Sequence, residues 1–71
     1  MNTVIRMKSG ENVYIYGLTS IKAMMPEKTI TYTKKDFSEF VCRSARSYTF
    51  IAGQEIFAVS GEDIRCVHFS E

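Results

Sequence analysis

Cys66 and His68 lie two residues apart in the stretch EDIRCVHFSE, and both side chains can bind zinc or take part in nucleophilic catalysis. On a β-strand they would point to the same face, about 7 Å apart. A zinc site needs about four ligands, so Cys42 and Glu71 would have to complete it. The spacing matches no standard zinc motif, which favours a structural cysteine and histidine over a metal centre.

A catalytic Cys-His pair has little support in the sequence. The histidine would have to reach the thiol by a hydrogen bond and be oriented by a third group. Pairing of Cys42 with His68 is geometrically open, but no local motif supports it. The chain has one histidine, no Gly-rich phosphate loop and no paired acidic cluster. We therefore predict no catalytic residue, no metal ligand and no cofactor.

Size and composition indicate one small folded domain spanning residues 1–71. The hydrophobic fraction is 45% and the charged fraction 24%, both ordinary for a globular protein. No apolar run approaches the roughly 20 residues of a membrane helix, and Arg6 and Lys8 interrupt any signal-peptide core. We therefore expect a cytoplasmic protein with free thiols, in which a Cys42–Cys66 bridge would form only after secretion.

Alternating or β-rich runs separated by turn residues predict strands at residues 3–8, 13–18, 29–33, 48–53, 55–59 and 63–69. Residues 34–48 predict the one helix, with Asp36 as its N-cap and Glu39 completing a capping box. Residues 19–28 carry no clear signal. The sequence therefore predicts an α+β fold, a small, strongly twisted antiparallel sheet or semi-open barrel of five to six strands with one helix.

The last predicted strand has two distinct faces. Alternation directs Val67 and Phe69 to the core and places Ile64, Cys66 and His68 on the opposite face. We expect that second face to lie toward a partner or a second copy of the chain.

Charge and aromatic residues suggest a binding surface. Residues 22–49 hold six basic and three acidic side chains, and residues 50–71 hold one basic and four acidic side chains. On the predicted helix, four basic residues form one face. The predicted partner contacts are Tyr14, Tyr16, Lys34, Lys35, Arg43 and Arg46, because exposed tyrosine and arginine are common interface anchors. An alternative is that the basic helix face and tyrosines bind RNA or DNA through phosphate contacts and stacking.

A short opening strand ending in SGE, a helix-bearing middle and the closing stretch YTFIAGQEIFAVSGEDIRCVHF resemble small uncharacterised proteins of phages and prophages in Gram-positive bacteria. The resemblance covers most of the chain in pattern, rests on no signature motif and transfers no functional residue. It implies a small Sm-like or SH3-like barrel that binds and inhibits a host protein, as anti-CRISPR inhibitors do. We therefore expect a non-enzymatic accessory or inhibitor protein that occludes a surface of a host or phage protein. We also expect homodimers paired through sheet edges.

Overall fold

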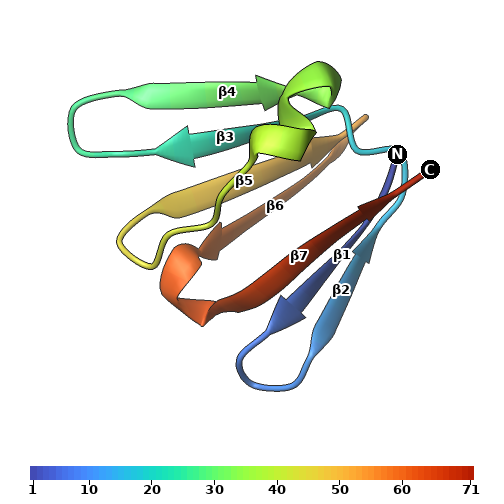
Figure 1. The fold of residues 1–71 in the computed structure, drawn as a ribbon, viewed down its shortest axis with the longest axis horizontal. Coiled ribbons are helices and arrows are strands. Elements are labelled where there is room, and N and C mark those ends of the chain that lie inside the picture. Colours follow the sequence, from blue (N-terminus) through green and yellow to red (C-terminus); the bar gives the residue numbers. More distant parts are fainter.

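The computed structural model describes residues 1–71, which form seven β-strands in two antiparallel sheets (Figure 1). The elements are β1 (Asn2–Met7), β2 (Asn12–Ile15), β3 (Ser20–Met24), β4 (Thr29–Thr33), the 3-10 turn η1 (Lys34–Glu39), β5 (Ser47–Ala52), β6 (Glu55–Ser60), the 3-10 turn η2 (Gly61–Asp63) and β7 (Ile64–Ser70). The strand orders are β2-β1-β7 and β4-β3-β5-β6. The two sheets lie at an angle to each other, with the core between them. No helix is long and apolar enough to cross a lipid bilayer.

Short turns fix the register of two hairpins. Between β1 and β2, the Met7 amide donates to the Glu11 carbonyl (2.8 Å) and the Gly10 amide donates to the Met7 carbonyl (3.0 Å). Gly10 has a φ of 100°, which suits a three-residue turn that ends in a left-handed residue. Between β5 and β6, Gly53 (φ 61°) is the first of two linking residues, the position that a type II′ turn gives to glycine.

The prediction of an α+β fold is wrong. Strands make up 55% of the residues, the two sheets do not close into a barrel, and the only helical segments are the 3-10 turns η1 and η2. The helix expected over residues 34–48 is replaced by η1, an irregular segment at residues 40–46 and the start of β5. Its serines, aromatic residues and Val41 have low helix propensity. Tyr48 pairs as a strand residue with Ala23 and Val59 instead of completing a helical face.

Asp36 caps η1 from inside the turn and is not its N-cap. Its carboxylate accepts hydrogen bonds from the Thr33 amide and the Thr33 hydroxyl, both at 3.0 Å. Thr33 is the N-cap and Asp36 the third residue of the turn. The two hydrogen bonds, the backbone one first, hold the pKa of the Asp36 carboxyl below its ordinary value of 3.8.

Aromatic side chains join η1 and the segment after it to both sheets. Phe37 of η1 is buried and stacks on Phe69 of β7, with ring centroids 5.0 Å apart. Phe40 makes edge contacts with Tyr32 (5.2 Å), Tyr48 (5.3 Å) and Phe69 (6.0 Å). These contacts fill the side of the core between β7 and the four-stranded sheet. The buried core cluster is Ile5, Leu18, Ile21, Ala23, Phe37, Tyr48, Phe50 and Ile64.

Tyr48 and Gly61 hold the irregular segment in place. The Tyr48 hydroxyl accepts a hydrogen bond from the Arg43 amide (2.7 Å) and donates one to the Val41 carbonyl (3.3 Å). The Gly61 amide donates to the Arg46 carbonyl (2.7 Å). The segment is therefore tied to β5 through a side chain and to η2 through the backbone.

One buried polar side chain has no partner. Thr3 lies on β1 opposite Ile15 and Phe69 and is only 1% exposed. Its hydroxyl makes no hydrogen bond. Burial of an unpaired hydroxyl is unfavourable, so this position lowers the stability of the fold.

Candidate protein-binding surface

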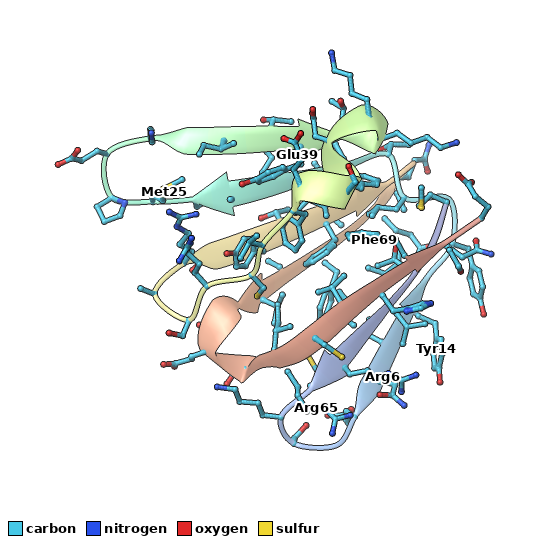
Figure 2. All side chains as sticks on the ribbon, in the orientation of Figure 1. Arg6, Tyr14, Met25, Glu39, Arg65 and Phe69 are labelled. Carbon is cyan, nitrogen blue, oxygen red and sulfur yellow. The ribbon has the colours of Figure 1, made fainter.

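Tyr14 is exposed on the three-stranded sheet, and Tyr16 is exposed in the bend directly after β2. Tyr14 is 57% exposed and Tyr16 is 72% exposed. Val13 and Ile15 flank Tyr14 in β2 and pack against the core, because successive strand residues point to opposite faces. Figure 2 shows Arg6 and Tyr14 both directed away from the four-stranded sheet. The two tyrosines predicted as contacts are therefore available to a partner.

The strand register adds β1 and β7 residues to the same face. Val4 pairs with both Tyr14 and His68, so these three side chains form one row across the sheet. Arg6 pairs with both Asn12 and Cys66 and forms the next row. We call this surface the tyrosine face, defined by the sheet residues Val4, Arg6, Asn12, Tyr14, Cys66 and His68 together with Tyr16, which directly follows β2.

The outward direction of Cys66 and His68 agrees with their predicted face, but the prediction for Ile64 is wrong. Ile64 is 5% exposed and belongs to the core cluster. The register shifts between Arg6 and Met7, so that Arg6 pairs with Cys66 and Met7 with Ile64. Arg65 is thus an extra residue in β7, and this bulge turns Ile64 inward.

Cys66 and His68 have no further ligand-type neighbours that would make a metal site. No three His, Cys, Asp or Glu side chains gather in a group that could hold a metal ion. Cys42 is half-buried, and burial raises the pKa of its thiol. Cys66 is exposed, and both cysteines are free. Cys42 and Cys66 both line a shallow groove of about 320 Å³ between β7 and residues 40–42.

The four predicted basic contacts do not form a helix face, since the helix is absent. Lys34 and Lys35 lie in η1, and Lys34 Nζ is 4.0 Å from the Glu71 carboxylate at the surface. Arg43 and Arg46 lie in the segment before β5. Figure 1 shows η1 beside the chain termini and the turn before β5 at the other end of the molecule. The basic residues are therefore divided between two places, and neither pair lies on the tyrosine face.

An apolar groove separates the edge strands β2 and β6, and sequence reasoning did not find it. Its volume is about 160 Å³, and Glu55 is the one charged residue that lines it. The other lining residues are Val13, Tyr14, Ile15, Phe50, Ile56 and Phe57. Ile56 is 70% exposed and adds an uncovered apolar side chain to this groove. The sequence predicted a strand at residues 55–59, but not which strand would lie beside it.

The chain is a small all-β domain of two open sheets. Exposed aromatic residues lie on the tyrosine face, and exposed apolar residues line the groove between the edge strands β2 and β6. No family model, curated protein or solved structure matches the chain.

Proposed function

We propose that this chain is a non-enzymatic accessory or inhibitor protein of the phage type that binds a host protein through the tyrosine face and occludes its surface. The observation that carries this proposal is the exposure of Tyr14 and Tyr16 beside Arg6 and His68 on an uncovered sheet. Tyrosine and arginine are enriched among the residues that dominate protein interfaces. Tyrosine also supplies a large contact area at a low cost in side-chain entropy.

The chemistry of the tyrosine face favours a protein partner over a nucleic acid. Arg6 is the one lysine or arginine among its residues, and the Arg6 guanidinium already contacts the Asn12 side chain at 3.5 Å. Nucleic-acid binding relies on several basic side chains that neutralise phosphates together. The alternative of RNA or DNA binding depended on a basic helix face that the chain does not form.

The test is capture of a host protein followed by measurement of its affinity with purified components. We expect Tyr14→Ala and Tyr16→Ala together to weaken binding at least tenfold, because truncation of a central interface tyrosine typically costs more than about 1 kcal/mol. Met24→Ala is the matched control, since Met24 is 51% exposed on the outer face of the other sheet. Equal loss of binding in the Met24 variant, or full binding by the tyrosine variant, would contradict the proposal.

A further inference from the structure

β6 presents an unprotected edge at the border of the four-stranded sheet. Its six residues, EIFAVS, contain no proline and no lysine or arginine, and its pairing with β5 runs without a bulge from Glu55 to Ser60. Soluble proteins usually guard such edges with charges, prolines, bulges or covering segments. The absence of these features makes β6 the strand of this fold best suited to pair with another strand.

The other three edges are each obstructed or short. β7 has the bulge at Arg65, and the segment at residues 40–42 lies along its edge across a groove. β4 has Lys28 directly before it and Lys34 directly after it, so two copies paired about its centre would oppose like charges. β2 has only four residues.

The turn before β6 determines which of its backbone groups are free. In a two-residue hairpin the residues that flank the turn, here Ala52 and Glu55, form a hydrogen-bonded pair. Hydrogen-bonded and open pairs then alternate along the ladder, so the amides and carbonyls of Ile56, Ala58 and Ser60 point away from β5. These groups form a regular row of unpaired donors and acceptors.

We propose that a second copy of this chain pairs its β6 antiparallel to this one, with Ala58 at the two-fold axis. Ala58 then pairs with Ala58 of the second copy, and Ile56 pairs with Ser60 of the second copy. Glu55 lies opposite Gly61 of the second copy, so the strand's one charged residue does not meet itself. The β6 sequence is therefore complementary to itself in this register.

The apolar groove beside β6 supports a second copy as the occupant. Ile56 and Phe57 line this groove together with Val13 and Ile15 of β2. A strand paired to β6 would cover it and remove apolar surface from water, which adds to the backbone hydrogen bonds. The chain has only 11 buried residues of 71. Burial of more apolar surface between two copies would therefore increase its stability.

Oligomeric state and cross-linking test this proposal with the full chain. Light scattering coupled to size exclusion, from about 1 μM to about 1 mM, should show a mass that rises from the 8.1 kDa of one chain to twice that value.

Ala58→Cys should form an intermolecular disulfide under mild oxidation, because paired strand residues lie about 5.5 Å apart between Cα atoms. Thr31→Cys, at the middle of the β4 edge, is the matched control. A monomer at all concentrations, or equal cross-linking by both variants, would overturn the proposal.

Two variants that place opposite charges at Ala58 distinguish loss of strand pairing from loss of folding. Ala58 is exposed, so Ala58→Lys and Ala58→Glu should each fold and each dimerise at least tenfold more weakly, since like charges would lie directly opposite. An equimolar mixture of the two variants should recover dimers. Thr31→Lys should leave the dimer intact. Undiminished dimers of Ala58→Lys, or a mixture that stays monomeric, would refute the edge assignment, and neither result bears on partner binding through Tyr14 and Tyr16.

Discussion

Replacement of Gly61 by alanine should cost this protein a large part of its stability. A Cβ at Gly61 would overlap the carbonyl oxygen of Arg43 and lie 2.7 Å from that of Arg46. Both obstacles are backbone atoms, which cannot rotate away as a side chain can. The segment must therefore shift, which weakens the 2.7 Å hydrogen bond from the Gly61 amide to Arg46 and the 2.7 Å bond from the Arg43 amide to Tyr48.

The magnitude follows from these two hydrogen bonds. Each contributes about 1 kcal/mol net, and a buried group left without a partner costs about 1–3 kcal/mol, so we expect a loss of roughly 2–4 kcal/mol. A domain of this size has a total of roughly 4–10 kcal/mol. Urea unfolding followed by circular dichroism measures the difference in the free energy of unfolding.

Gly53→Ala is the matched control for Gly61→Ala. Gly53 has a φ of 61° and no atom near its missing Cβ, so the control tests backbone strain alone, at about 1–2 kcal/mol. Gly61→Ala combined with Tyr48→Phe should cost less than the sum of the single changes, because both act on the residue 43–46 segment. The reasoning fails if Gly61→Ala costs no more than Gly53→Ala, or if the double variant is additive.

Three smaller predictions concern a buried hydroxyl, a titrating carboxyl and two thiols. Thr3→Val should raise the free energy of unfolding by about 1 kcal/mol, because it removes an unpaired buried hydroxyl at nearly constant shape; a destabilised variant in thermal unfolding would show that the hydroxyl has a partner. The pKa of Asp36 is lowered in the folded chain, so its contribution to stability is present at neutral pH and is lost as the pH falls below 3.8 and through the folded-state pKa. The stability difference between the wild type and Asp36→Asn, measured by urea unfolding at several pH values, should therefore shrink toward acid pH, and a constant difference would contradict this. Iodoacetamide at about pH 8 should modify exposed Cys66 before Cys42, whose pKa is raised by burial, and peptide mass spectrometry showing the opposite order would refute it.

Strands with an alternating or β-rich sequence could be predicted, and β3, which has neither signal, could not. TITYT predicts residues 29–33, and β4 has those same bounds. β3 was missed because Lys22, Ala23 and Met24 are common helix formers. Its position between β4 and β5 comes from tertiary pairing, which overrides local preference.

The candidate binding surface could be predicted only in part for a similar reason. The exposure of Tyr14 follows from local alternation with Val13 and Ile15. Tyr14 lies in one row with His68 because β1 pairs with both β2 and β7. This pairing joins residues far apart in sequence. The bulge at Arg65 has no sequence signal, since neither glycine nor proline marks it.

The central place of β1 in its sheet has a consequence for how the chain reaches its native state. β1 pairs with β2 on one side and with β7 on the other. The backbone hydrogen bonds on its second side can therefore form only when β7, the last strand, is in place. Bringing together residues so far apart in sequence costs loop-closure entropy before the contact stabilises the chain. Such contacts therefore slow folding. While β7 is unpaired, Phe37 also lacks Phe69, its stacking partner across the core. Completion of the three-stranded sheet and enclosure of the aromatic cluster are therefore coupled, because both require β7 to be in place.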